Sequence, residues 1–270
     1  MKQKRYATVK DTCCLEKAFS RQTISQRQKV KEMLMDEISR ELEELASPEE
    51  KDKRTCWELQ YQEKPRLHGT PTDSIRKISA KSFLKVKMKP KEEIFKLCEE
   101  LLSTGYIEER TVAFDWAFRL QKNYAESDFH TLESWLKKYV HSWGACDDLC
   151  THALGAFILQ FPKFISNTKE WAKSANRWIR RASAVTLIYS IRRGKHLEHV
   201  FEIADSLLTD KDVMVQKGYG WMLKEATKHY PQEVFDYVLK NRKEMPRTSL
   251  RYAIEKLSPT LKKEAMKKEI

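Results

Sequence analysis

A tryptophan and an aspartate four residues apart have the spacing most suggestive of chemistry in this sequence. Trp143 and Asp147 lie within the segment Tyr-Val-His-Ser-Trp-Gly-Ala-Cys-Asp-Asp-Leu, residues 139–149. A large aromatic face beside a carboxylate can hold a cation. The alternative interpretation is structural. Asp147 and Asp148 stand where a new helix could begin, and an aspartate at that position caps the helix and favours its positive end.

The apolar patterns on either side predict two helices that meet at this segment, separated by Gly144. The first pattern repeats at intervals of three and four residues through Leu132, Trp135, Leu136, Tyr139 and Val140. The second repeats every four residues through Leu149, Ala153, Phe157 and Phe161. We therefore expect a helix–helix corner that holds Trp143 and Asp147.

The overall composition favours long helices and a polyanionic partner. Of 270 residues, 33% are charged, only seven are glycine and eight are proline, which argues against a turn-rich sheet protein. The net charge is +12. A basic chain of this kind fits RNA, DNA or an anionic membrane surface, so the charge by itself leaves these three open.

The sequence gives no support for a membrane span or a secretory signal. No apolar run approaches the roughly 18–20 residues that a span requires, and the N-terminus, Met1-Lys2-Gln3-Lys4-Arg5, lacks a hydrophobic core. We therefore expect an intracellular protein, cytoplasmic or associated with the nucleoid.

The motifs of nucleotide-driven and metal-dependent enzymes are also missing. The sequence contains no Gly-rich phosphate loop, no G-x-S-x-G and no H-E-x-x-H, so we expect no nucleotide cofactor and no metal. Six cysteines are scattered without paired C-x-x-C motifs. Cys146 and Cys150, with His141 and His152 nearby, leave a metal site as an alternative to buried core cysteines.

The N-terminal part of the chain predicts a flexible end, a long helix and a loop. Residues 1–22 are polar and basic without periodicity, so we expect a flexible segment. A helix is predicted from Ser25 to Leu45 and is ended by Pro48 and the charge run Glu49–Arg54. A loop then leads into a helix from about Thr72. Four cations recur on it and predict a basic face, either solvated or contacting phosphate: Arg76, Lys77, Lys81 and Lys85.

Beyond Pro90 the chain reads as a regular series of helices. We predict helices over Thr111–Tyr124, Trp171–Ile191, Val213–His229, Pro231–Leu239 and Pro246–Leu257. From the central corner onward, one helix of each pair recurs about every 35 residues, near Leu154, Val185, Trp221 and Ala253. Paired helices at this period are typical of a HEAT-like α-solenoid. The sequence therefore predicts an all-α solenoid with a concave basic face, a single domain over residues 23–260 and a charged tail over 261–270.

Two further segments could serve a ligand. The first, Asn176-Arg177-Trp178-Ile179-Arg180-Arg181, gathers three arginines beside a tryptophan. The second, residues 215–221, places Gly218 and Gly220 within a helix, where each costs about 1 kcal/mol relative to alanine. Such glycines allow the close approach of a ligand or of a neighbouring helix, and the sequence leaves both possibilities open.

Taken together, these strings resemble the AlkD-type alkylpurine DNA glycosylases, which are HEAT-like-repeat enzymes of DNA alkylation repair. The resemblance covers residues from about 25 to 258. It rests on Gly69-Thr70-Pro71 with Arg76, Trp143-Gly-Ala-Cys-Asp147, Trp178-Ile-Arg-Arg181, Lys217-Gly-Tyr-Gly-Trp221-Met-Leu-Lys224, Met245-Pro-Arg-Thr248 and Leu250-Arg-Tyr-Ala-Ile-Glu255. Members of this family remove 3-methyladenine and 7-methylguanine from duplex DNA without a cofactor.

The resemblance implies a role for several residues. Asp147 corresponds to the family's catalytic aspartate, Trp143 and Trp221 to its active-site tryptophans, and Arg181 to an arginine that contacts the DNA backbone. The Trp-x-x-x-Asp spacing favours Asp147 over Asp148. We expect further DNA contacts from Arg177, Arg180, Lys217 and Arg247. The expected protein is thus a monomeric, monofunctional glycosylase acting on alkylated double-stranded DNA, and the alternative is a non-catalytic solenoid that binds DNA or a protein partner.

Overall fold

The computed structural model describes residues 31–61 and 65–267, and helices dominate this part of the chain. An N-terminal helix covers 31–44. It is followed by α2 (Pro48–Glu58), α3 (Thr72–Phe83), α4 (Lys91–Ser103), α5 (Ile107–Arg119), α6 (Asp128–Tyr139), α7 (Trp143–Leu149), α8 (Gly155–Gln160), α9 (Ile165–Trp171), α10 (Arg177–Val185), α11 (Ile188–Ile191), α12 (Leu197–Ser206), α13 (Val213–Ala226), α14 (Pro231–Asn241), α15 (Arg247–Ala253) and α16 (Pro259–Met266). No strand occurs within the described residues, where Arg66 and Tyr106 form an isolated bridge.

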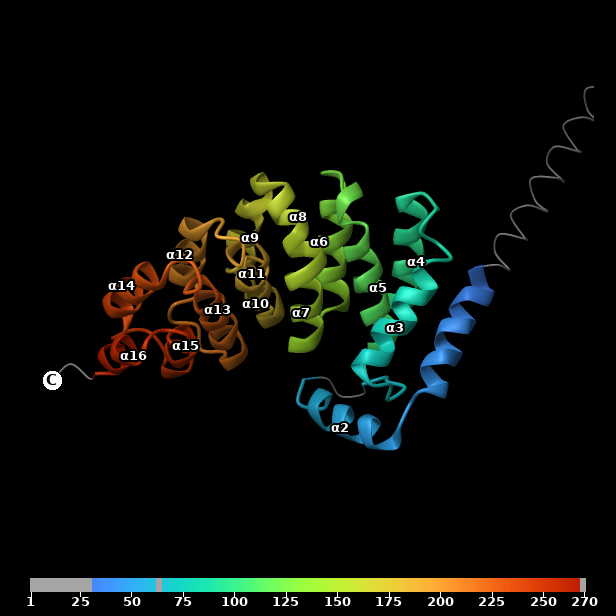
Figure 1. Ribbon diagram of the computed structural model, residues 1–270, viewed down its shortest axis with the longest axis horizontal. Helices are drawn as coiled ribbons and strands as arrows, with labels where there is room; N and C mark the ends of the chain where they lie inside the picture. The colour runs from blue at the N-terminus through green and yellow to red at the C-terminus, as the bar shows by residue number, and fades with distance from the viewer. Residues whose placement is uncertain (1–30, 62–64, 268–270) are drawn as a thin grey trace, which may run out of the picture.

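The helices stand side by side in chain order along an arc (Figure 1), as a solenoid requires. The repeating helices packed one behind the next are α7, α10, α13 and α15, and each packs against its neighbour in this series. Their apolar stripes are buried in one continuous core that runs the length of the stack. The predicted all-α, HEAT-like fold is confirmed. Among the described helices, none combines the length and apolar character needed to cross a bilayer.

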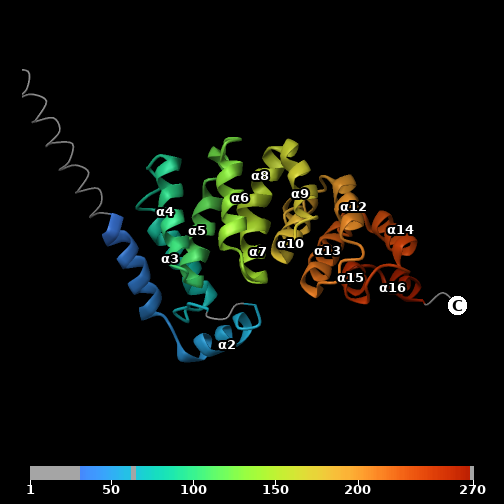
Figure 2. The same ribbon diagram turned by 180° about the vertical axis from the view of Figure 1, so that it is seen from behind.

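The first helix ends close to the predicted Leu45, but the charge run after Pro48, which we expected only to end that helix, forms a helix of its own. Ser47 accepts a hydrogen bond from the Glu50 N–H and caps α2, while Pro48 occupies the first turn, where its missing N–H costs nothing. No residue of α2 is buried, so no apolar stripe marked this helix in the sequence. Both views place α2 across the ends of the helices between α3 and α7 (Figures 1 and 2).

The central corner also begins earlier than expected, and neither aspartate caps it. Ser142 is the capping residue of α7, and its side chain accepts from the Ala145 N–H. The helix therefore starts at Trp143 and places Asp147 in its second turn. It continues through a π-helical turn over Cys150–Leu154 into α8. Such turns are often found at functional sites.

The single helix expected over Trp171–Ile191 is instead divided. The chain leaves α9 after Trp171, and Asn176 caps the start of α10 by accepting from the Trp178 N–H. The first part of the N-terminal prediction, residues 1–22, lies outside the described residues. At the other end, α16 includes residues that we expected to belong to a charged tail, and its Ala265 is buried.

Most of the basic face predicted on α3 is neutralised by acids of the same chain. Lys81 pairs with Glu41 at 2.7 Å and Lys85 with Glu37 at 2.5 Å, both from the N-terminal helix. Arg76 turns toward Asp148 of α7. These pairs favour a structural interpretation of the face over a phosphate-binding one.

The helical glycines serve close packing between neighbouring helices. A Cβ at Gly220 would lie 2.7 Å from Tyr252 Cβ and 2.9 Å from the Ser249 carbonyl oxygen, both on α15. Gly155 meets Tyr189 and Thr186 in the same way, with a Cβ only 2.5 Å from Tyr189 Cβ. Two glycines thus let successive helices of the stack approach at backbone distance, which decides the question that the sequence left open for Gly220.

Replacing Gly220 by alanine should destabilise the protein even though alanine favours helices. The new methyl group meets a backbone oxygen and a Cβ, neither of which can swing away, and overpacking of this kind typically costs about 1–3 kcal/mol. Urea unfolding followed by circular dichroism measures the change. Gly144→Ala is the matched control, because a Cβ there meets nothing within 4 Å. It should be neutral or slightly stabilising, and equal effects of the two substitutions would contradict the packing argument.

Candidate functional site

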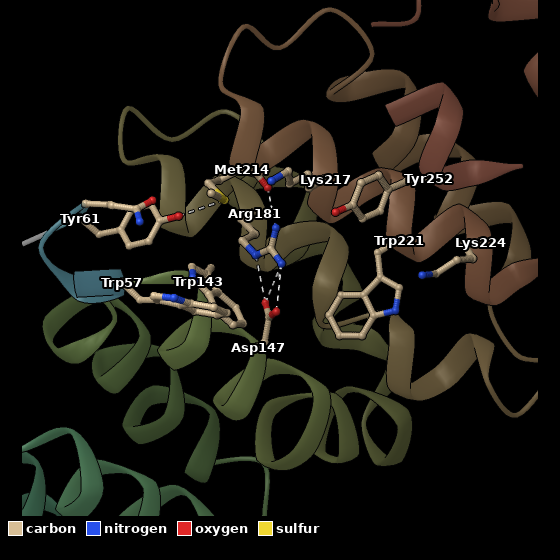
Figure 3. Close-up of a pocket in the computed structure, with 11 residues that line it drawn as sticks. Trp57, Tyr61, Trp143, Asp147, Arg181, Met214, Lys217, Trp221, Lys224 and Tyr252 are labelled. Carbon is tan, nitrogen blue, oxygen red and sulfur yellow. Dashed lines mark hydrogen bonds and ion pairs between the residues drawn. The ribbon is translucent and has the colours of Figure 1, made fainter. Parts of the chain in front are cut away.

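A pocket of about 520 Å³ lies where α2, α7, α10, α13 and α15 come together. Figure 3 shows its lining, which consists of Trp57, Gln60, Tyr61, Trp143, Asp147, Arg181, Met214, Lys217, Trp221, Lys224 and Tyr252. Three tryptophans, two tyrosines, one carboxylate and three cationic side chains therefore share one cavity. Asp147 lies between Trp143 and Trp221 in this view.

The carboxylate of Asp147 is held by a two-point ion pair with Arg181. Arg181 Nε donates to Asp147 Oδ1 at 2.9 Å, and Nη2 donates to Oδ2 at 3.0 Å. The remaining guanidinium nitrogen, Nη1, donates to the Met214 carbonyl oxygen at 2.5 Å. Because Arg181 comes from α10 and Met214 from α13, the pair joins three successive helices of the stack.

Burial gives this pair an unusual electrostatic setting. The Arg181 side chain is 6% exposed and that of Asp147 is 19% exposed. Burial raises the pKa of Asp147 above its ordinary value, and the adjacent Arg181 guanidinium opposes that rise. A carboxylate has about four lone-pair positions. The two that Arg181 does not use remain available to the pocket.

Neighbouring side chains hold the aromatic walls of the pocket in place. The Trp143 ring lies 5.9 Å from the Trp57 ring, centroid to centroid, at a tilt of 46°. Trp221 Nε1 donates to Glu225 Oε1 at 3.0 Å. Burial of Glu225 is outweighed by hydrogen bonds from Arg192, Lys228 and Trp221, which bring the pKa of Glu225 to about 2. An ionised Glu225 therefore orients the indole of Trp221 at all physiological pH values.

The five predicted DNA-contacting cations fall into different settings. Arg181 and Lys217 line the pocket. Arg177 pairs with Asp212 at 3.2 Å, and Arg180 pairs with Asp210 at 2.7 Å. Arg247 is exposed at the start of α15, outside the pocket lining. Arg181 is thus an internal partner of Asp147 in this structure, whereas Lys217 and Arg247 have no acidic partner among the described residues.

Several lining residues were not predicted from the sequence. Trp57 and Tyr61 come from the α2 region, and the others are Gln60, Met214, Lys224 and Tyr252. Tyr61 meets the Trp178 ring edge-on at 5.4 Å and donates its O–H to the Met214 sulfur at 4.0 Å. A sequence signal existed only for Lys224 and Tyr252, which lie within the strings that carried the family resemblance. Nothing periodic marked Trp57 or Tyr61.

Asp148, Cys146 and Cys150 do not line the pocket. The Asp148 carboxylate accepts from Arg76 Nη2 at 2.5 Å and does not line the cavity. Cys146 and Cys150 are buried, and burial raises the pKa of the Cys146 thiol. Among the described residues, no cluster of His, Cys, Asp or Glu could hold a metal ion.

Comparison with known proteins identifies the family of this chain. The family model described as DNA alkylation repair enzyme matches residues 38–257. A predicted DNA alkylation repair enzyme from Enterococcus faecalis has a similar fold, with a TM-score of 0.69 and 16% identity over 79% of this chain and 97% of that one. AlkD2 from Streptococcus mutans matches with a TM-score of 0.54 and 21% identity, over 68% of this chain and 90% of its own.

Another solved structure, smu.31 from Streptococcus mutans UA159, aligns with a TM-score of 0.53 and 21% identity over 68% of this chain and 94% of that one. At these identities the solved structures indicate the fold alone. The comparison with curated proteins gave no match. The family model nevertheless spans most of the sequence and includes every residue that lines the pocket. This chain belongs to the DNA alkylation repair enzyme family.

Proposed function

We propose that this protein is a monofunctional DNA glycosylase that hydrolyses the N-glycosidic bond of cationic alkylated purines, such as 3-methyladenine and 7-methylguanine, in duplex DNA. The observation that carries the proposal is the carboxylate of Asp147, fixed by Arg181 and flanked by tryptophans in one pocket. The product is an abasic site and a free base. We expect a monomer that works with the cell's DNA in the cytoplasm or nucleoid and needs no cofactor.

The alkylated base needs little activation by the enzyme before it leaves. Methylation at N3 or N7 places a positive charge on the purine, which makes it a good leaving group without protonation. Breaking the glycosidic bond develops positive charge on the sugar, as in glycoside hydrolysis. A preorganised carboxylate stabilises that charge and can orient the attacking water. The lone pairs of Asp147 that Arg181 leaves open are suited to both tasks.

The aromatic side chains supply the complementary attraction. The faces of Trp143 and Trp221 favour a cationic nucleotide by about 0.5–2 kcal/mol each, depending on how well water is excluded. Neutral purines lack this attraction and are far poorer leaving groups, so the same pocket disfavours undamaged DNA. Lys217 and Arg247, which have no acidic partner among the described residues, are suited to phosphate contacts.

The direct test is incubation with duplex DNA that contains 7-methylguanine or 3-methyladenine, scored for the free base by chromatography. Release of the base, with the strand left intact until alkali is added, is the expected result. Binding without any release would reject the glycosylase and favour the alternative, a non-catalytic solenoid that binds DNA.

Asp147→Asn should abolish most of the activity, because the amide keeps the shape but loses the negative charge. Removing one electrostatic group from a preorganised site typically costs 2.7–4 kcal/mol, so single-turnover base release should fall about 10²-fold or more. The substitution also leaves the buried Arg181 without its counter-charge, which should cost on the order of 3 kcal/mol of folding stability. Rates are therefore compared at a temperature where circular dichroism reports a folded variant.

Asp148→Asn tests whether Asp148, and not the adjacent Asp147, is the catalytic carboxylate. Asp148 points to Arg76 and away from the pocket, so its substitution should lose far less base release near neutral pH. If the two variants exchange their behaviour, Asp148 is the catalytic carboxylate and the assignment to Asp147 is wrong.

Trp57 should contribute to DNA binding through its face at the mouth of the pocket. It is 51% exposed and lies beside Trp143. Stacking of a base on an aromatic side chain is worth about 1–3 kcal/mol, so Trp57→Ala should weaken binding of alkylated DNA by roughly tenfold in a fluorescence anisotropy titration. Leu59 is equally exposed, at 54%, but does not line the pocket. Leu59→Ala should bind normally, and equal losses would indicate a general effect of the α2 region.

Lys217→Ala should weaken DNA binding almost independently of sequence. If Lys217 neutralises one phosphate, the slope of log Kd against log salt concentration should decrease by about one. Lys96, an exposed lysine of α4 outside the pocket, is the control, and Lys96→Ala should leave the slope unchanged. An unchanged slope for Lys217→Ala would exclude a phosphate contact.

A further inference from the structure

Two adjacent carboxylates on α7 are each held by an arginine from a different neighbouring element. Asp147 faces Arg181 of α10, and Asp148 faces Arg76 of α3. The two aspartates therefore face different neighbours, Asp147 in the pocket and Asp148 toward the N-terminal part of the stack. Only the pair on the pocket side has a role in the proposed chemistry, which leaves the second pair without an assigned function.

The second pair is the end of a chain of alternating charges. Besides its contact with Asp148, Arg76 Nη1 lies 3.6 Å from Asp115 Oδ1. Asp115 in turn accepts from Arg119 Nε at 2.7 Å and from Ser79 Oγ at 2.5 Å. Both acids are largely buried, with 12% of Asp115 and 14% of Asp148 exposed. Asp115 and Asp148 thus contact Arg76 from two sides, and these contacts fix the position of its positive charge beside Asp148.

We infer that Arg76, acting through Asp148, is a positioning residue that keeps Asp147 ionised and aimed into the pocket. The inference rests on the proposed function only in taking Asp147 as the catalytic group. The effect of Arg76 on the ionisation of Asp147 is a property of the folded protein and can be measured without DNA.

The physical reason is repulsion between neighbouring carboxylates. The negative charge of Asp148 contributes to the raised pKa of Asp147. Arg76 places a positive charge beside Asp148 that opposes this contribution, and the ion pair also ties α7 to α3. Burial remains the main cause that raises the pKa of Asp147, and Arg181 lowers it.

The other charged groups around the two aspartates do not replace Arg76. His152 lies one turn beyond Asp148, in the π-helical turn that follows α7. Its Nδ1 atom lies 3.5 Å from Asp148 Oδ1 but only 2.9 Å from the Asp148 carbonyl oxygen. Arg110 of α5 interacts with the charge of Asp148 from within the protein, without an ion pair to it. The charged groups around the two aspartates include, by element, Arg76 of α3, Arg110 and Asp115 of α5, His152 beyond α7, Arg181 of α10, and Lys217 and Lys224 of α13, while Arg119 of α5 pairs with Asp115.

Two single substitutions should therefore move the titration of Asp147 in opposite directions. Arg76→Gln leaves Asp148 without its main counter-charge and raises the pKa of Asp147. Asp148→Asn removes the negative charge next to Asp147 while Arg76 stays nearby, paired with Asp115, and lowers the pKa of Asp147. The double variant, Arg76→Gln with Asp148→Asn, removes both charges and should return the pKa close to that of the unmodified protein.

Carboxyl ¹³C NMR of aspartate-labelled protein, with Asp147→Asn used to assign the signal, measures these shifts directly. Since the ionised carboxylate is the active form, the acid limb of base release should follow: to higher pH for Arg76→Gln and to lower pH for Asp148→Asn. Lys91→Met breaks a comparable buried ion pair, Lys91–Asp128 at 2.7 Å, far from the pocket. It should move neither the signal nor the limb.

The outcomes separate this inference from the proposed function. A purely structural role for Arg76 predicts lower thermal stability and slower release at every pH, with the Asp147 midpoint unmoved in both single variants, and this result would overturn the inference. Opposite shifts with recovery in the double variant support it, even if the unmodified protein releases no base. In that case the electrostatic inference stands and the glycosylase proposal fails.

Discussion

The buried ion pair between Asp147 and Arg181 is the interaction on which the rest of the site depends. Removing two charges from water is expensive, and the loss is offset only by good geometry and complete hydrogen bonding. Here the guanidinium donates to both carboxylate oxygens and donates a third hydrogen bond, from Nη1, to the Met214 carbonyl oxygen. The pair therefore requires α7, α10 and α13 to lie in one fixed arrangement, and it holds a carboxylate in a place where burial alone would favour its neutral form.

The solenoid provides that arrangement by packing its repeating helices at backbone distance. Gly155 and Gly220 admit the next helix where any side chain would collide with it. Each repeating helix can then contribute one or two side chains to a common cavity: Asp147 from α7, Arg181 from α10, Trp221 from α13 and Tyr252 from α15. A site assembled from successive repeats is sensitive to their spacing, which gives a physical reason for glycines inside these helices despite their unfavourable propensity.

The α2 region closes the pocket on a different physical basis. Its helix buries no side chain and is held by its Ser47 cap and by contacts at its C-terminal end, where Trp57 meets Trp143 and Tyr61 meets Trp178. Its Trp57 side chain remains half exposed. In a basic protein with a repair-family fold, exposed aromatic surface beside a carboxylate is consistent with a large, charged ligand that supplies the missing cover.

The helical repeat and the chemical types at the centre of the site could be predicted from the amino-acid sequence alone. Apolar periodicity is a local property, so it predicted the solenoid, the helix that carries Trp221 and the helix–helix corner that holds Trp143 and Asp147. Local patterns could not decide which residue starts α7, because Ser142 and the two aspartates are all good caps. They also missed α2, which has no buried face. The partner of each charge was decided only by the tertiary structure: Arg181 lies 34 residues from Asp147 and Arg76 lies 72 residues from Asp148. Such pairs depend on how the repeats stack, and no short-range pattern encodes that.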